Sequence, residues 1–272
     1  MLPSVEILIP VYNRKNLILK CVNSALNQTY SNVSVIVSDN NSSDGTWEKL
    51  SKIKDNKLKI FKNDNNIGLF ENFNKLISYS KKDFSIFLCS DDWLDPYFIE
   101  KSLKFFFDHK DLVMVSSASR AFNEKSKKKL IANYLICKKY NFDEVLYDWF
   151  LTSFKSGINP FTYPSGIMLK GEVLRKNIFF DKSFGSPADI IFFLDIIKHG
   201  KVFFTDYLGA NIFIHSNQAH KSFEQDGSLI HSQLKIINKY KTKLIEFNIY
   251  KTIMIYSCIP VLKILIKNYF NK

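Results

Sequence analysis

Carboxylate side chains stand where two apolar runs of this chain end, and carboxylates in such places can bind a cation. Asp91 and Asp92 directly follow the run FSIFLCS, and Asp39 ends the run VSVIVS. Adjacent like charges repel each other, and their burial is costly unless a positive charge lies nearby. A Mg²⁺ or Mn²⁺ ion would supply that charge, so the doubled aspartate predicts a metal site. The alternative is a solvated acidic turn that caps the helix predicted after Pro96.

Four β-branched runs alternate with amphipathic stretches over the first half of the chain, which is typical of βαβ units. The predicted strands cover 5–10, 33–39, 58–62 and 84–91, and the predicted helices cover about 16–27, 46–53, 69–80 and 97–107. Continuous apolar strands indicate an α/β fold with a Rossmann-like, mostly parallel sheet flanked by helices. Ligands bind beyond the carboxyl ends of such strands, so Asp39 and Asp91 should share one edge. The alternative is a turn or N-cap role, above all for Asp44 and Gly45.

The composition is that of a globular protein, since 46% of the residues are hydrophobic and 24% are charged. Lysine and arginine give a formal net charge of +12, which suits an anionic membrane or a phosphate-bearing small molecule. The lysines are dispersed along the chain, so we expect no nucleic-acid partner. The four cysteines form no CxxC pair, and MLP leads directly into a strand, so we expect a reducing, cytoplasmic location.

Four motifs, in this order and spacing, resemble those of the inverting family 2 glycosyltransferases. ILIPVYNR is similar to the family's opening strand and turn, and VIVSDNNSSDGT to its D-D-G-S-x-D-G-T segment. NNIGLFENFN resembles the N-x-G segment, and FLCSDDWL resembles the metal-binding DxD-D element. The resemblance is strong over 1–110 and looser to about 220, and it implies the GT-A fold. It implies a nucleotide-sugar-binding half at 1–115, an acceptor-binding half at 116–227 and a C-terminal helical extension at 228–272.

The resemblance also implies a nucleotide site at the first strand ends. It assigns nucleotide contacts to Pro10, Val11, Tyr12, Asn13, Arg14, Asp39, Asn66, Gly68, Asn72, Ser90 and Asp91. A carboxylate such as Asp39 can accept a hydrogen bond from the N3–H of uracil or thymine, and an aromatic ring such as Tyr12 can stack on the base. We therefore expect a UDP-sugar as the donor. Core packing is the alternative for Tyr12, and Glu71 and Asn72 stand where relatives often carry an arginine.

The metal ligands are implied by the same resemblance, with Mn²⁺ or Mg²⁺ as the cofactor. Asp91 falls on the second aspartate of the family's DxD and is the first choice of ligand, and Asp92 is the second. Cys89 stands where many relatives carry the first aspartate, which removes one carboxylate from the site. His215 follows the last predicted strand, where family members commonly place a histidine near the metal or diphosphate. The alternative for His215 is a structural role.

An inverting transfer needs a base that takes the proton of the acceptor hydroxyl as it attacks the anomeric carbon. The resemblance assigns this role to Asp189, which opens a predicted helix, with Ala188 in place of the family's glutamate. The alternative is an acid that only complements the helix dipole. Asp195 is expected in a salt bridge or at the surface. Ser165 and Gly166 are implied to line the sugar pocket.

The C-terminal stretch from Thr252 is apolar and studded with lysines. Its charge-free part, 252–262, has 11 residues, well short of the ~20 that a membrane span requires. Lys263 and Lys267 share one face of a predicted helix, beside Ile264, Leu265 and Ile266. We expect this helix to lie on an anionic membrane surface. Packing on the protein core is the alternative.

The resemblance implies a metal-dependent hexosyl- or N-acetylhexosaminyl-transferase of the inverting type. It also implies a glycan or lipid-linked acceptor of cell-surface polysaccharide or lipooligosaccharide assembly, and we expect the protein on the inner face of the cytoplasmic membrane. A nucleotidyltransferase or metal-dependent phosphodiesterase could use the same acidic site, although the chain has no GxxxxGK[ST] or GxGxxG loop. A basic membrane- or nucleic-acid-binding module is the rival that is not an enzyme.

Overall fold

The computed structural model describes residues 2–124, 129–132, 137–153, 161, 163–185, 187–215 and 228–249. Its centre is a 10-stranded sheet in the order β3-β2-β1-β4-β9-β6-β10-β5, with β7 paired to β6 and β8 to β10. The strands are β1 (Val5–Val11), β2 (Val33–Asp39), β3 (Leu58–Lys62), β4 (Phe84–Phe87), β5 (Trp93–Leu94), β6 (Leu112–Asn123), β7 (Lys129–Ala132), β8 (Lys138–Tyr140), β9 (Ile167–Lys170) and β10 (Lys201–Ile214).

The first four strands of the chain are parallel, and the polar and acidic residues singled out in the sequence lie at or follow their carboxyl ends. β1 lies between β2 and β4, and β3 lies outside β2. In this register Val11 is paired with Asp39, and Asp39 with Lys62. The ends of β1, β2 and β3 are therefore level, whereas β4 ends earlier, with Phe87 paired to Leu8. The prediction of a mostly parallel sheet is confirmed.

The second half of the chain extends the same sheet. β9 is antiparallel to both β4 and β6, and β6 is parallel to β10. The predicted division between 115 and 116 falls within β6, so both predicted halves contribute to one sheet. β10 pairs with β5 through Ala210 and Asn211, and this pairing brings the end of β10 to the turn that contains Asp91 and Asp92.

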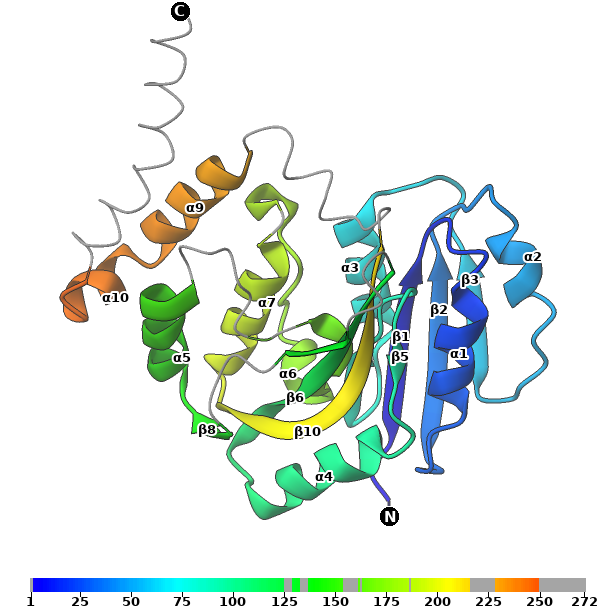
Figure 1. The fold of residues 1–272 in the computed structure, drawn as a ribbon, viewed down its shortest axis with the longest axis horizontal. Coiled ribbons are helices and arrows are strands. Elements are labelled where there is room, and N and C mark those ends of the chain that lie inside the picture. The colour runs from blue at the N-terminus through cyan, green and yellow to red at the C-terminus, as the bar shows by residue number, and fades with distance from the viewer. Residues whose placement is uncertain are drawn as a thin grey trace, which may run out of the picture.

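Helices cover both faces of the sheet (Figure 1). They are α1 (Ile18–Leu26), α2 (Thr46–Leu50), α3 (Leu69–Tyr79), α4 (Phe98–Asp108), α5 (Phe142–Asp148), α6 (Gly171–Leu174), α7 (Ala188–Ile197), α9 (Ser228–Lys239) and α10 (Lys241–Glu246), with single turns η1 (Trp149–Ser153), η3 (Pro164–Gly166) and η4 (Lys182–Phe184). α1 and α4 pack on one face, and α3 and α7 pack on the other.

Alternation along β1 shows how the two faces are built. Ile7 and Ile9 belong to the cluster under α1 and α4, whereas Leu8 belongs to the cluster under α3 and α7. All three side chains are fully buried. Burial of an aliphatic side chain of this size is worth about 1.5–3 kcal/mol. The two apolar layers therefore hold β1 in the middle of the sheet and keep its carboxyl end in a defined place.

The described part of the C-terminal extension packs against the rest of the protein. Tyr240 and Leu244 are buried in the cluster that contains α7. On the surface of this contact, Lys239 Nζ lies 2.9 Å from Asp195 Oδ2, which confirms the salt bridge expected for Asp195. The apolar stretch 252–272 lies outside the described residues. Among the helices that the structure describes, none is long and apolar enough to cross a membrane.

Candidate functional site

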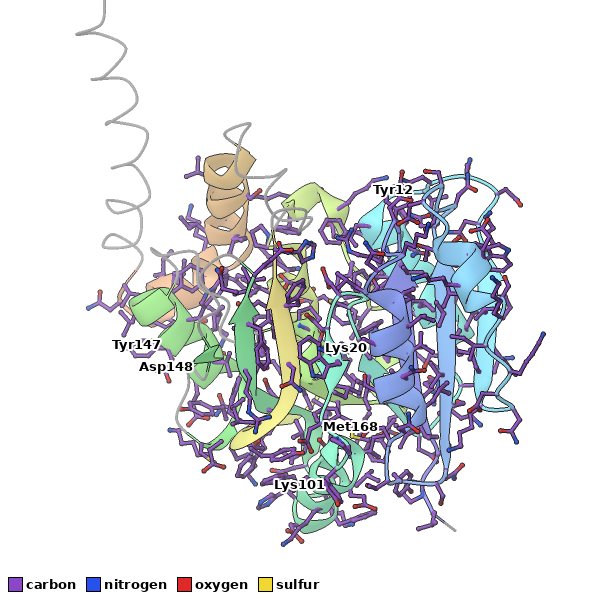
Figure 2. All side chains as sticks on the ribbon, turned by 45° about the vertical axis from the view of Figure 1, so that its right-hand side comes forward. Tyr12, Lys20, Lys101, Tyr147, Asp148 and Met168 are labelled. Atoms are coloured by element: carbon purple, nitrogen blue, oxygen red, sulfur yellow. The ribbon has the colours of Figure 1, made fainter. Side chains whose placement is uncertain are left out.

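The turn after β1 lies at the carboxyl edge of the sheet. Pro10 and Val11 are the buried last residues of β1, and the next side chain, Tyr12, is 42% exposed. Figure 2 places Tyr12 at the end of the molecule opposite Lys101 of α4. The exposure excludes the alternative that Tyr12 is a core residue. An aromatic face in this position can stack on a base.

The segment between β2 and α2 holds the β1 turn in place. Asn13 has a φ of +50°, a left-handed conformation that asparagine tolerates better than most residues. Its side-chain oxygen accepts a hydrogen bond from the Ser43 N–H at 2.9 Å, and its own N–H donates to Ser42 Oγ at 2.9 Å. The N–H of Arg14 donates to Thr46 Oγ1 at 2.9 Å. The backbone of the predicted nucleotide-binding turn is therefore positioned by the segment that follows β2.

Asp44 has the turn role that was the alternative for it, and the N-cap of α2 is Gly45, which has no side-chain cap. The Asp44 carboxylate accepts from the Lys15 N–H at 2.9 Å and from the Thr46 N–H at 3.0 Å. The Thr46 hydroxyl also donates to it. Burial raises the pKa of Asp44, but these hydrogen bonds together outweigh burial and hold the pKa below its usual value. The Asp44 carboxylate thus connects the β1 turn to the start of α2 through hydrogen bonds.

Asp39 ends β2 fully buried beneath the same turn. Its carboxylate accepts hydrogen bonds from the backbone N–H of Ser42 at 3.2 Å and from the Ser42 hydroxyl. An ionised carboxylate has about four lone-pair sites, so two local hydrogen bonds leave capacity for a further donor. The position and chemistry of Asp39 suit an N–H of a base that enters from the edge.

A network of side-chain amides connects the end of β2 to the N-x-G segment. Asn40 Nδ2 donates to Asn66 Oδ1 at 2.7 Å, and Asn40 Oδ1 accepts from the Ile67 N–H at 3.0 Å. Asn63 Nδ2 donates to the same Asn40 oxygen at 2.9 Å. Gly68, with a φ of +89°, then leads into α3. Asn40, which we did not predict as a site residue, positions Asn66 and Gly68, and its place in the D-D-G-S-like motif was the available signal.

Asn72 belongs to this network from the side of α3. It is 2% exposed, accepts from the Ser38 hydroxyl at 2.7 Å, and donates to the Ser38 carbonyl at 3.0 Å. Asn63 donates to it as well, at 3.2 Å. The structure therefore gives Asn72 the task of joining α3 to β2, and its predicted nucleotide contact stays a prediction.

The acidic turn begins earlier than the sequence indicated. We predicted a strand to Asp91, but β4 ends at Phe87. The Leu88 N–H still donates to the Leu8 carbonyl at 3.0 Å, and the Asp92 N–H then donates to the Cys89 carbonyl at 3.0 Å and closes a turn. The predicted strand was too long because the apolar run includes Leu88, which is buried in the core but follows the end of β4. Ser90, a predicted nucleotide contact, is buried within this turn.

Asp92 points into the protein and joins three segments. It is 3% exposed, and its two oxygens accept from the Ser165 hydroxyl of η3 at 2.5 Å and from the Phe213 N–H of β10 at 3.0 Å. Burial, followed by the charge of Asp91, raises the pKa of Asp92 well above its usual value. The structure thus shows Asp92 in a positioning role, and its predicted contact with a metal stays a prediction.

Asp91 points toward two side chains that can carry positive charge. His215 Nε2 lies 3.0 Å from Asp91 Oδ2, and Arg14 Nε lies 3.6 Å from the same oxygen. The three side chains are 13%, 8% and 18% exposed for Asp91, His215 and Arg14. The doubled aspartate is therefore tolerated because Asp92 is buried with a raised pKa, whereas Asp91 faces Arg14 and His215.

The residues at Asp91 fit a divalent cation that takes most of its ligands from a substrate. A carboxylate oxygen and an imidazole nitrogen lie together there, and both atom types bind Mn²⁺. Mg²⁺ sites of nucleotide enzymes usually combine one or two carboxylates with phosphate oxygens and water. In the described part of the chain, no three or more His, Cys, Asp or Glu side chains gather as a metal site. Asp91 and His215 would hold the ion, and a diphosphate and water would complete its coordination.

Asp189 approaches this edge from α7. It lies in the first turn of the helix, where its Oδ1 accepts from the Ile190 N–H at 2.7 Å. Its charge contributes to the raised pKa of Cys89, after burial and the charges of Asp92 and Asp91. The fold therefore brings the predicted base into the electrostatic environment of the acidic turn.

The two residues predicted for the sugar pocket are both buried. Besides donating to Asp92, Ser165 Oγ accepts from the Cys89 N–H at 3.1 Å. A Cβ atom added to Gly166 would lie 3.0 Å from Ser117 Oγ, so glycine permits the close approach of η3 and β6. Ser165 and Gly166 thus help to assemble the site, and their contact with a sugar stays a prediction.

Known proteins are similar to this chain in sequence and in fold. Residues 6–174 match the family described as glycosyl transferase family 2. Chondroitin synthase of Pasteurella multocida is 37% identical over 134 residues, 48% of this chain and 14% of that protein. UDP-Glc:alpha-D-GlcNAc-diphosphoundecaprenol beta-1,3-glucosyltransferase WfaP of Escherichia coli is 39% identical over 89 residues, 33% of this chain and 36% of that protein. The chain thus spans only a minor part of the length of these relatives.

Solved structures share the architecture at low sequence identity. S. aureus TarS 1-349 in complex with UDP-GlcNAc has a TM-score of 0.65 and 17% identity, over 86% of this chain and 67% of that one. The mannosyltransferase PcManGT from Pyrobaculum calidifontis, in complex with GDP-Man and Mn2+, has a TM-score of 0.63 and 14% identity, over 94% of this chain and 73% of that one. Because the family match covers more than half of its residues, the chain belongs to glycosyl transferase family 2, and its fold is of the GT-A type.

Proposed function

We propose that this protein is a metal-dependent inverting glycosyltransferase that takes its sugar from a UDP-sugar. The observation that carries the proposal is the pairing of Asp91 with His215 at the carboxyl edge of the sheet, beside the turn that ends in Arg14. An acidic metal site next to a base-binding turn suits a donor that carries both a base and a diphosphate. The family and the fold agree with this arrangement.

The base end of the donor would lie on the β1 turn. Tyr12 presents an exposed aromatic face, and Asp39 lies buried behind it at the end of β2. Uracil offers a ring to stack and an N3–H to donate, whereas neutral cytosine has no N3–H. TarS, a structural relative, has been solved with UDP-GlcNAc. These features support UDP over CDP for this chain.

The diphosphate would lie toward Asp91. A divalent ion bound there would stabilise the negative charge that develops on the leaving diphosphate. Asp91 and His215 would hold that ion, and Asp92 would keep both in place through its hydrogen bond to the Phe213 N–H. PcManGT, which shares this fold, has been solved with Mn2+.

Asp189 would act on the acceptor. Its carboxylate would take the proton from the attacking hydroxyl while the sugar departs from the diphosphate on the opposite face. Its location at the start of α7, in the electrostatic environment of the acidic turn, supports this role.

For the acceptor we propose a glycan or a lipid-linked oligosaccharide of cell-surface polysaccharide assembly. WfaP, to which this chain is similar, is named for a diphosphoundecaprenol-linked acceptor, and chondroitin synthase is named for a polysaccharide. The net charge of +12 also suits a protein that meets anionic lipid at the inner face of the cytoplasmic membrane.

A thermal-shift experiment tests the proposal. The melting temperature is measured with UDP, GDP and CDP, each in Mn²⁺ and in excess EDTA. A ligand at 100 times its Kd stabilises the folded state by about 2.7 kcal/mol. We expect UDP with Mn²⁺ to give the largest rise and EDTA to reduce it. Equal shifts for all three nucleotides would refute the uracil assignment, and no shift with any of them would refute the proposed function.

A further inference from the structure

We propose that Arg14 is the resting counter-ion of Asp91, and that it transfers from Asp91 to the donor diphosphate when metal and donor bind. The inference rests on the function proposed above and deepens it. It gives one side chain two partners, Asp91 in the empty site and the diphosphate in the site with donor and metal bound. Arg14 would then be a donor-binding residue whose resting partner is a metal ligand.

The guanidinium of Arg14 lies across the β1 turn. Its Nη1 donates to the Asn13 carbonyl at 3.1 Å and is 3.4 Å from the Tyr12 carbonyl. Its Nε lies 3.6 Å from Asp91 Oδ2. The side chain therefore spans the space between the residues that would stack on the base and the residue that would hold the metal. In a nucleotide-sugar, the diphosphate occupies that interval.

The contact with Asp91 conflicts with metal binding. Asp91 Oδ2 already has His215 Nε2 at 3.0 Å, so the same oxygen faces two side chains from different parts of the chain. A divalent ion on this oxygen would stand within a few ångströms of the guanidinium, and both would be positive. Unlike exposed ion pairs, such partly buried charges are weakly screened by solvent and salt. Metal binding would therefore expel the guanidinium unless another anion arrived to hold it.

The donor diphosphate is an anion of the required kind. The planar fork of an arginine matches two phosphate oxygens, and such charge-assisted hydrogen bonds are among the strong ones. The backbone N–H of Arg14 donates to Thr46 Oγ1 at 2.9 Å, which holds the main chain in place. The side chain can turn toward the diphosphate while this hydrogen bond is kept. The exchange would replace one carboxylate contact by a phosphate contact and free Asp91 for the metal.

The test compares Arg14→Gln and Arg14→Lys with wild type. Titration calorimetry measures the affinity for Mn²⁺ alone and then for UDP in saturating Mn²⁺. The matched control is Arg175→Gln, which removes the same charge from an exposed arginine whose Nη1 donates to the Lys82 carbonyl before β4. Thermal melts establish that each variant is folded.

We expect Arg14→Gln to bind Mn²⁺ alone more tightly than wild type, and UDP with Mn²⁺ about 10-fold more weakly, since a charge-assisted contact to phosphate is lost. Arg14→Lys keeps the charge without the fork, so it should retain the wild-type Mn²⁺ affinity and lose part of the UDP affinity, even if Arg14→Gln does not fold. Weaker Mn²⁺ binding by Arg14→Gln, unchanged UDP affinity, or equal effects in Arg175→Gln would overturn the exchange. Wild type that binds no UDP would instead overturn the proposed function.

Discussion

His215 Nε2 lies 3.0 Å from Asp91 Oδ2, although 124 positions separate the two residues in the chain. The contact exists because β10 ends beside the acidic turn, where the Phe213 N–H is bound by Asp92. One aspartate of the pair therefore holds the strand that delivers the histidine to the other. The two neighbouring carboxylates thus have different roles, and we expect different effects when Asp91 or the partners of Asp92 are replaced.

Replacement of Asp91 by Asn should abolish glycosyl transfer. The amide carries no charge to attract a divalent ion, so Mn²⁺-dependent UDP binding should weaken as well. Transfer is followed with a radiolabelled UDP-sugar, and UDP binding by calorimetry. Asp108→Asn, which removes an exposed carboxylate at the end of α4, is the control and should behave as wild type. Full activity of Asp91→Asn, or of wild type in excess EDTA, would contradict the metal assignment.

Replacement of Asp189 by Asn should remove transfer but leave UDP affinity within a few-fold of wild type. The proposed base contacts the acceptor, so its loss affects a step after donor binding. The same two assays separate these effects, with Asp206→Asn, an exposed position in β10, as the control. Loss of UDP binding together with residual transfer would show that Asp189 has another role.

Replacement of Ser165 by Ala should lower the free energy of unfolding by about 1–3 kcal/mol, because a buried Asp92 oxygen and the Cys89 N–H each lose a hydrogen-bond partner. Urea unfolding measures this difference. Ser31→Ala, at an exposed turn before β2, is the control and should change little. A stability equal to wild type would mean that the Asp92–Ser165 pair does not hold the acidic turn.

Replacement of Asp44 by Asn should make the stability of the protein less dependent on pH. The folded-state pKa of Asp44 lies below its unfolded value of about 3.9. Its stabilising contribution is therefore fully present above that unfolded value and is lost as the pH falls through the lower folded pKa. Wild type should exceed Asp44→Asn in unfolding free energy at pH 7, and the difference should shrink below about pH 4. A constant difference from pH 7 to pH 3 would contradict this account.

Deletion of residues 252–272 should release the protein from anionic vesicles and leave UDP binding intact. The sheet that builds the site lies upstream of Thr252, whereas the deleted stretch contains Lys263, Lys267 and Lys272. Each lysine near an anionic surface contributes about 1 kcal/mol, and salt screens that part. Vesicle co-sedimentation at low and high salt measures the binding. If the truncated protein is instead unstable, and intact protein ignores vesicles, then the stretch packs on the core.

Much of the first half of the fold was predictable, because strands and helices there follow local periodicity. The predicted strands at 33–39 and 58–62 coincide with β2 and β3, and the predicted helix at 69–80 coincides with α3 within one residue. The carboxyl ends of parallel strands that are joined by helices lie at one edge of the sheet. The sequence therefore also determined that Asp39 and Asp91 would lie at the same edge.

The roles within the acidic turn were decided only by the tertiary structure. Asp91 and Asp92 are adjacent and chemically identical, so no local pattern says which one faces inward. Ser165 and Phe213, which lie 73 and 121 positions from Asp92, bind its two oxygens. Arg14 precedes Asp91 by 77 positions in the chain, and His215 follows it by 124. The sequence determined which residue types arrive at this edge, but burial and long-range hydrogen bonds determined which carboxylate positions the site and which is left to face a cation.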